Sequence, residues 1–380
     1  MSKVKIYTYS HNRPDFIQLQ YESIKRHVKD DFEFIVFNNE RPGGDPGSGY
    51  SSERLDQIFN ICNELNIKCI RVELDPELKY INGYLQYDNN GSFALGGSYA
   101  CSYAFTWGWK HYISRDKSVS IMIDSDMFFI KDVSFSNMMK EHNFAFVPHY
   151  RYLSYFKSES EPGEFAFSYP WNGFVVANIP NMPNPHELSW GLANYNGITC
   201  DVGGECLTYM NKYKDQLKIK YFDQISIQRD SYVENDPHTI PKNQNQIEVG
   251  INGSLAVLLE YDNEKDLILP FETYAPTIKG GAYYADDRSY PYQTKRDNYW
   301  EYFKNMFQYI IDKFLVKFNF PKPSFVDLIK LESDDIEESF IFHYKNASNS
   351  HIWMGENYNS KKTESLKMLL NQIRGNKNAI

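Results

Sequence analysis

Two carboxylates, Asp124 and Asp126, follow a run of three apolar residues, Ile121 to Ile123. Such a run is typical of a strand that is buried on both faces, as in the middle of a parallel sheet. In open α/β sheets, ligands bind at the carboxyl ends of central strands, and carboxylate oxygens there could hold a hard divalent cation. The alternative interpretation of Asp-Ser-Asp is an Asx turn that closes the strand.

A second acidic pair lies in the segment Cys200-Asp-Val-Gly-Gly-Glu205, which precedes a helical pattern. Gly203 and Gly204 would let a ligand approach the backbone closely, with Asp201 and Glu205 beside it. The same residues are equally consistent with a glycine-rich turn that has an acidic bias at a helix start.

Alternating strand and helix patterns must position these groups. Apolar runs predict strands over Val4 to Tyr9, Glu33 to Phe37 and Lys68 to Leu74, and helical spacing separates them. A further helix, with Ala100 and Trp107 on it, leads into the strand before Asp124. We therefore expect an α/β fold with a Rossmann-like, mostly parallel central sheet flanked by helices. Beyond it we expect a loop over Arg151 to Ser168 and a strand that follows Trp171 and Asn172.

Composition and the absence of certain motifs argue against several classes of protein. The 380 residues carry a net charge of −9, which argues against nucleic acid as the main partner. The five cysteines contain no Cys-x-x-Cys pattern and predict reduced thiols. The chain has neither Gly-x-Gly-x-x-Gly after the first strand nor a P-loop, which disfavours a dehydrogenase and a P-loop NTPase. The polar start and the lack of a long apolar window predict a cytoplasmic protein.

The chain divides into three expected regions. Residues 1–225 form the core, with a nucleotide-binding half (1–132) and a second half (133–225). Residues 226–296 are expected to be an irregular insertion or acceptor region, and 297–380 a carboxy-terminal helical extension. Within the extension, residues 298–318 have a wide apolar face that we expect to pack on the core. Weak association with a membrane surface is the alternative. A homodimer also stays open.

Taken in order, four segments resemble the GT-A class of nucleotide-sugar glycosyltransferases. They are an opening strand that ends in Tyr-Ser-His-Asn-Arg-Pro (residues 9–14), Asp-x-Asp after a central strand, an Asn-Gly-Phe-Val-Val-Ala strand (172–177), and a late histidine, His343. The last two are similar to features of the retaining families related to glycogenin and galactosyltransferases.

The resemblance implies a metal-dependent transferase that takes a sugar from a UDP- or GDP-linked donor to a glycan, glycoprotein or glycolipid acceptor. It also implies that residues 133–225 are the sugar or acceptor half of the core. It implies that Asp124, Asp126 and His343 bind Mn²⁺ or Mg²⁺. The donor-binding residues would be Thr8, Tyr9, His11, Arg13, Asn38, Asn39, Ser98, Asp124 and Ser125. The sugar or acceptor would meet Trp171, Asn172, Trp190, Gly203 and Gly204, with Asp201 and Glu205 as catalytic candidates.

The chemistry of sugar transfer leaves the stereochemical outcome open. A cation stabilises the charge that develops on the leaving diphosphate, and an imidazole ligand favours Mn²⁺. If the reaction inverts, Asp201 or Glu205 could take the acceptor proton as a general base. If it retains, the donor phosphate can serve as the base. Related retaining enzymes carry Asp-Gln-Asp where this chain has Asp201-Val-Gly.

Two alternatives to a glycosyltransferase remain. A catalytically silent binding or structural protein could keep the fold and would not need Asp124 or Asp126. A nucleotidyltransferase that acts on a sugar phosphate could use a similar sheet, although it normally has a phosphate loop rich in glycine and lysine after its first strand. The segment His11-Asn-Arg-Pro is a poor substitute for that loop.

Overall fold

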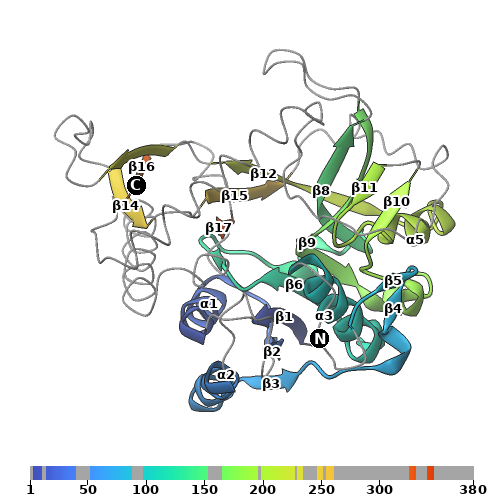
Figure 1. Cartoon of the computed structure of the whole chain (residues 1–380), viewed down its shortest axis with the longest axis horizontal. Helices are drawn as coiled ribbons and strands as arrows, with labels where there is room; N and C mark the ends of the chain where they lie inside the picture. The colour runs from blue at the N-terminus through green and yellow to red at the C-terminus, as the bar shows by residue number, and fades with distance from the viewer. Residues whose placement is uncertain are drawn as a thin grey trace, which may run out of the picture.

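The computed structural model describes most of the first 226 residues and several later strands (Figure 1). The described residues are 3–10, 14–39, 52–87, 97–152, 165–195, 198–226, 229–233, 246–250, 254–260, 325–330 and 340–345.

Four parallel strands form the amino-terminal half of the central sheet. β1 (Val4–Ser10), β2 (Phe32–Asn38) and β3 (Lys68–Arg71) are connected by α1 (Pro14–His27) and α2 (Ser52–Glu64). β6 (Val119–Asp124) follows α3 (Gly97–His111) and pairs in parallel with the other side of β1. The strand order β3-β2-β1-β6 confirms the expected α/β architecture with a parallel central sheet flanked by helices.

Side chains of β1 alternate between two hydrophobic layers. Ile6 packs in the cluster that includes Ile24 of α1 and Ile58 of α2. Tyr7 and Tyr9 belong to the other cluster, which includes much of α3. A strand covered on both faces needs apolar residues at successive positions, which is why this strand lacks an alternating polar pattern.

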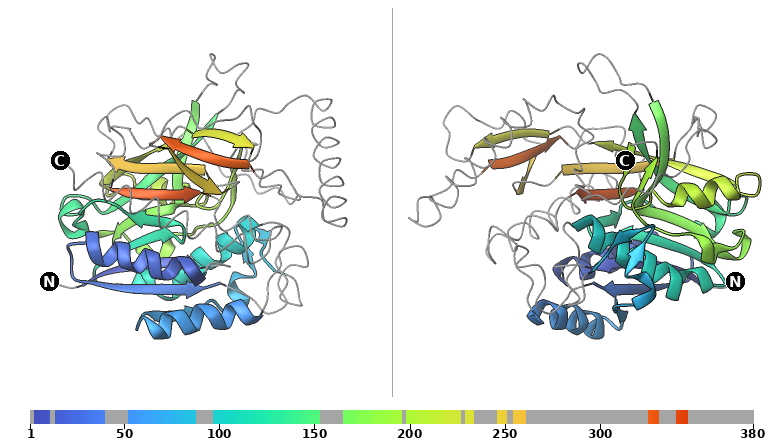
Figure 2. Two further views of the ribbon diagram at one scale, coloured as in Figure 1. Left: turned by 90° about the vertical axis from the view of Figure 1, so that its left-hand side faces the viewer. Right: turned by 45° about the vertical axis from the view of Figure 1, so that its right-hand side comes forward.

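The sheet continues beyond β6 through strands of mixed direction. β9 (Phe165–Asn178) runs antiparallel to β6 and to β8 (Phe144–Tyr152), and β12 (Ile219–Ser226) is parallel to β8. β15 (Ser254–Glu260), β17 (Ile341–Lys345) and β7 (Met127–Phe129) then follow by antiparallel pairing. In both views of Figure 2, β15 and β17 (yellow and orange) lie above the blue amino-terminal strands.

Two expectations about loops were wrong in part. The predicted loop over Arg151 to Ser168 is shorter, because β8 extends to Tyr152 and β9 begins at Phe165. Residues 226–296 are not irregular throughout, since β15 supplies an apolar strand to the central sheet, and β13 (Arg229–Val233) and β14 (Gln246–Gly250) lie in a separate sheet. The partners of these strands are distant in sequence, so local composition gave no sign of the pairing. The proposed division into domains stays a prediction.

The remaining elements are short and surround the sheet. They are β4 (Tyr80–Ile81), β5 (Tyr84–Leu85), α4 (Phe135–Met138), β10 (Ala193–Tyr195), β11 (Ile198–Cys200), α5 (Cys206–Lys212), β13 (Arg229–Val233), β14 (Gln246–Gly250) and β16 (Phe325–Lys330). Four 3₁₀ helices cover Pro76–Leu78, Ile113–Arg115, Ile179–Asn181 and Pro185–Glu187.

The expected carboxy-terminal helical extension, including residues 298–318, lies outside the described residues except for β16, β17 and Phe340. Among the helices that the structure describes, none is long and apolar enough to cross a membrane.

Candidate metal and donor site

The Asp-Ser-Asp segment forms a sharp turn between two strands. β6 ends at Asp124, the chain turns through Ser125 and Asp126, and β7 begins at Met127. The side-chain amide of Gln20 on α1 donates to the backbone carbonyls of Asp124 (2.8 Å) and Met127 (3.0 Å). This buried glutamine ties both ends of the turn to one helix, so the two carboxylates are held by a fixed backbone.

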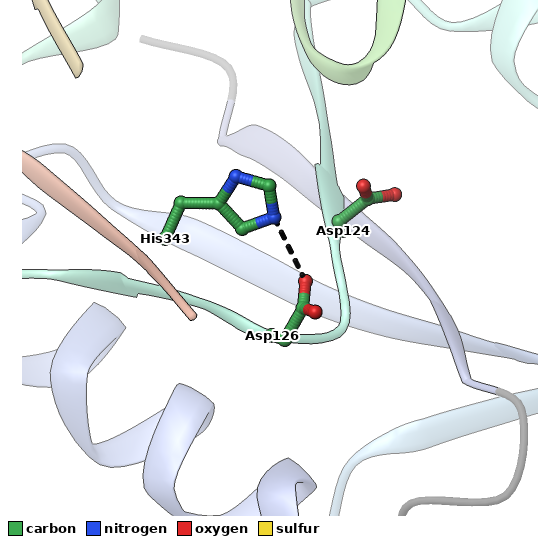
Figure 3. Close-up of side chains that lie close together, drawn as sticks. All are labelled: Asp124, Asp126 and His343. Carbon is green, nitrogen blue, oxygen red and sulfur yellow. Dashed lines mark ion pairs between the residues drawn. The ribbon is translucent and has the colours of Figure 1, made fainter. Parts of the chain in front are cut away.

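His343 reaches this turn from the far end of the chain. β17 pairs antiparallel with β7, and His343 lies opposite Met127. The His343 Nε2 atom is 3.3 Å from an Asp126 carboxylate oxygen (Figure 3). One candidate ligand atom from each of Asp124, Asp126 and His343 lies within 4.8 Å of the others. The structure therefore brings together the three residues that the sequence analysis named as metal ligands.

Electrostatics at this cluster favour a cation. Burial, and then the nearby charge of Asp126, raise the pKa of the Asp124 carboxyl to about 8. Two carboxylates this close and this buried repel each other unless a proton or a cation offsets their charge. Two oxygen ligands and one imidazole nitrogen are a donor set that suits Mn²⁺ and also accommodates Mg²⁺. The residues present thus fit the divalent cation that the sequence resemblance implies.

Trp171 and Asn172, on β9, flank the cluster. The ring centroids of Trp171 and His343 are 5.2 Å apart, with 39° between the planes. Asn172 is buried, and its amide donates to the Cys101 sulfur of α3 at 3.5 Å. β9 therefore places one predicted substrate-binding residue against the histidine and the next one against α3.

The predicted donor-binding residues on β1 lie inside the sheet. Thr8 is fully buried, and its hydroxyl has no hydrogen-bond partner within the described part of the chain. The Tyr9 ring stacks on the Phe105 ring, with 3.9 Å between the ring centroids, and its centroid lies 5.0 Å from that of Phe37. Tyr9 is therefore a core residue. His11 and Arg13 lie outside the described residues. A role for any of these four in donor binding stays a prediction.

The end of β2 is joined to the start of α3. Asn38 and Asn39 are buried at this edge, and the Asn39 amide donates to the Ala100 carbonyl at 3.4 Å. Ser98 lies half-buried in the first turn of α3, and Ser125 is half-buried in the Asp-Ser-Asp turn. A common role of these four side chains in donor binding also stays a prediction.

Asp201 and Glu205 occupy one loop but have different surroundings. The backbone N–H of Asp201 donates to the Tyr169 hydroxyl (2.9 Å), and its carboxylate accepts from the Val202 N–H (2.8 Å). Glu205 accepts a hydrogen bond from the Ser189 hydroxyl, and burial raises the pKa of its carboxyl. Because β9 carries both Tyr169 and Trp171, one strand connects this loop to His343, one of the three candidate metal ligands.

Packing explains the glycines of this loop without a ligand. Gly203 has φ +95°, and a Cβ there would lie 2.2 Å from the Pro170 carbonyl oxygen. A Cβ at Gly204 would lie 2.3 Å from that of Cys200. Trp190 is fully buried in the core, and its carbonyl accepts from the Gly203 N–H at 3.2 Å. Contact of Gly203, Gly204 or Trp190 with a substrate stays a prediction.

Sequence reasoning missed two residues beside the candidate metal ligands Asp124, Asp126 and His343. Gln20 was not singled out, and nothing in its helical pattern distinguishes it from a surface glutamine. Gly173 follows Trp171 and Asn172, and a Cβ there would lie 2.1 Å from the Trp171 ring. A glycine in a strand interior often marks a close approach, so Gly173 carried a signal that could have been used.

Comparison with known proteins finds only a weak structural similarity and no sequence match. No protein family and no curated protein matches the sequence. An active-site mutant of LgtC matches with 13% identity and a TM-score of 0.30, over 56% of this chain and 66% of that one. The mannosyltransferase Ktr4p from S. cerevisiae matches with 13% identity and a TM-score of 0.30, over 48% of this chain and 58% of that one. The chain thus spans less than two thirds of either protein, and likeness this low carries no argument about function.

Proposed function

We propose that this chain is a metal-dependent glycosyltransferase that moves a sugar from a nucleotide-diphosphate donor to a glycan, protein or lipid acceptor. The observation that carries the proposal is the convergence of Asp124, Asp126 and His343 beside the carboxyl end of β6. This is the position where open α/β sheets bind their ligands. The ordered resemblance of the sequence to GT-A transferases supports the same activity.

Each ligand residue has a distinct part in the proposed site. Asp124 and Asp126 would hold Mn²⁺ or Mg²⁺ through oxygen and His343 through nitrogen. A cation held there stabilises the negative charge of a leaving diphosphate. Asp124 must release its proton to bind a cation, because burial and Asp126 keep its pKa near 8. The Gln20 amide fixes the turn that carries both carboxylates, so their separation does not depend on the ligand.

Asp201 is the stronger of the two candidates for contact with the acceptor. Its carboxylate is half-buried and receives one hydrogen bond from its own loop, from the Val202 N–H. The Glu205 carboxylate accepts a hydrogen bond from the Ser189 hydroxyl and packs against Gly191, where an added Cβ would lie 2.3 Å from a Glu205 carboxylate oxygen. Glu205 therefore supports the loop. We propose that Asp201 orients the acceptor hydroxyl and, if the reaction inverts, takes its proton.

Nucleotide binding with and without metal tests this function. Thermal unfolding would be followed with UDP, GDP, TDP and CDP, each with Mn²⁺ or with EDTA. The proteins would be the wild type, Asp126→Ala and, as a matched control, the exposed Asp215→Ala. We expect one nucleotide to raise the melting temperature only with Mn²⁺, in the wild type and the control but not in Asp126→Ala.

Hydrolysis of the matching nucleotide sugar should then depend on the same metal and the same residue. No shift with any nucleotide would contradict the transferase function and favour a catalytically silent protein. A shift that persists in EDTA and in Asp126→Ala would mean that the turn is structural and that nucleotides bind elsewhere.

A further inference from the structure

The Trp171 ring contacts His343, one of the three candidate metal ligands. Its ring centroid lies 5.2 Å from that of His343, with the planes tilted by 39°. His343 is buried, with 4% of its surface exposed, and its Nε2 atom faces Asp126 at 3.3 Å. The indole therefore covers one side of an imidazole whose edge points to the carboxylates.

The Trp171 ring has this position because residue 173 has no side chain. A Cβ at Gly173 would lie 2.1 Å from two ring carbons of Trp171 and 2.6 Å from a third. Real Cβ atoms do not approach carbon this closely, so any larger residue must displace the ring. Gly173 does not have a positive φ, so its backbone angles do not require a glycine. The glycine is needed instead because it leaves room for the Trp171 ring.

The register of the sheet places Gly173 beside Asp124, one of the three candidate metal ligands. The last recorded pair between β6 and β9 is Ile123 with Phe174, and one step further along the same strands are Asp124 and Gly173. The ring that lies over Gly173 also contacts His343 on β17. A Cβ at Gly173 would therefore displace the same ring that lies against His343.

We propose that Trp171 is a positioning residue for His343 and that Gly173 is required because it makes room for the Trp171 ring. The indole restricts the imidazole to the orientation in which Nε2 points toward Asp126. Neighbours that orient a ligand in this way typically change metal affinity by about 10- to 100-fold when they are removed. The inference rests on the proposed function, because it concerns the third ligand of the same cation site.

A double-mutant cycle between the two residues tests the inference. The Mn²⁺ dissociation constant of the wild type, Gly173→Ala, Trp171→Ala and the double variant would be measured by calorimetry. We expect Gly173→Ala and Trp171→Ala each to weaken Mn²⁺ binding about tenfold. In the Trp171→Ala background, Gly173→Ala should have almost no further effect, because no ring is left to displace. Trp171→Phe, which keeps an aromatic ring, should recover most of the affinity.

A second readout does not need the metal. A ring close to His343 shifts the imidazole carbon-bound proton resonances, which can be assigned by their loss in His343→Gln. In metal-free protein we expect Trp171→Ala and Gly173→Ala to move these resonances in the same direction, toward the values of an unstacked histidine. Urea unfolding of each variant identifies any that has lost its fold, and Trp171→Phe then carries the comparison.

The outcomes separate the inference from the function. If His343→Gln weakens Mn²⁺ binding and Trp171→Ala does not, the positioning role is overturned while the metal site stands. If Gly173→Ala is equally harmful with and without Trp171, the glycine acts in another way and that half of the inference is wrong. If the wild type binds no Mn²⁺, the proposed function is refuted, and the resonances alone decide whether Trp171 and Gly173 orient the imidazole.

Discussion

Replacing Asp124 by Asn should change how the stability of the protein depends on pH. Burial and Asp126 raise the pKa of Asp124 from 3.8 to about 8 in the folded protein. A raised carboxyl pKa adds stability that is complete below the unfolded-state pKa and is lost as the pH rises through the folded-state pKa. Between the two values the folded chain holds one more proton than the unfolded chain. The side-chain amide of the Asp124→Asn variant binds no such proton, so the wild type should lose stability relative to the variant as the pH rises.

The size of this effect follows from the proton difference. One proton corresponds to between about 1 and 2 kcal/mol per pH unit, which gives roughly 3 kcal/mol between about pH 5 and pH 7. The Asp124 side chain is not completely enclosed, so solvent should reduce this to roughly 2 kcal/mol.

Urea unfolding in EDTA at several pH values measures the difference between wild type and Asp124→Asn. Glu187→Gln is a suitable control, because hydrogen bonds from Lys212 and then Tyr213 lower the pKa of Glu187. Glu187 is therefore ionised in both the folded and the unfolded chain between about pH 5 and pH 7. The difference in free energy of unfolding between Glu187→Gln and the wild type should then stay constant. A constant difference for Asp124→Asn as well would refute the argument that the carboxylate pair needs a proton or a cation. Mn²⁺ at about 100 times its dissociation constant should restore about 3 kcal/mol to the wild type and less to Asp124→Asn.

Two further predictions concern the loop after β11. Gly203→Ala should lower the free energy of unfolding by about 3 kcal/mol, because it combines φ +95° with a Cβ 2.2 Å from the Pro170 carbonyl oxygen. Gly83→Ala, at φ +78° on an exposed turn, should lower it by only about 1 kcal/mol, and equal losses in urea unfolding would contradict the packing argument. If the reaction inverts, Asp201→Asn should reduce kcat by about 100-fold or more, with the melting temperature nearly unchanged. Glu205→Gln should mainly shift the melting temperature, and the reverse pattern would exchange the two assignments.

The parts of the fold that could be predicted are those encoded by neighbouring residues. The first strands and helices alternate within short windows, and Asp124 follows a locally apolar strand, so both were evident from the sequence. His343 was named only through the resemblance to a family. Its neighbour β7 is more than two hundred residues away in the chain, and no local pattern can reveal such a pairing.

Two aromatic residues illustrate why other parts could not be predicted. The resemblance to a family placed both Trp171 and Trp190 at the sugar or acceptor. The structure buries Trp190 completely and places Trp171 beside His343. Residue type and local sequence are similar in the two cases, and only the tertiary packing distinguishes them. Gly173 shows the converse, because its importance depends on a ring two positions earlier in the same strand.

The order of the strands has a consequence for the synthesis of the protein. β6 and β7 are consecutive in the chain, yet six further pairings, through β9, β8, β12, β15 and β17, connect one to the other in the sheet. A ribosome completes both carboxylates long before it reaches His343. The nascent chain can therefore fold its amino-terminal layer early, but the proposed cation site cannot close until β17 has emerged and inserted against β7. Chains that terminate prematurely would carry the acidic pair without the imidazole, so completion of the polypeptide would itself limit when the proposed cation site forms.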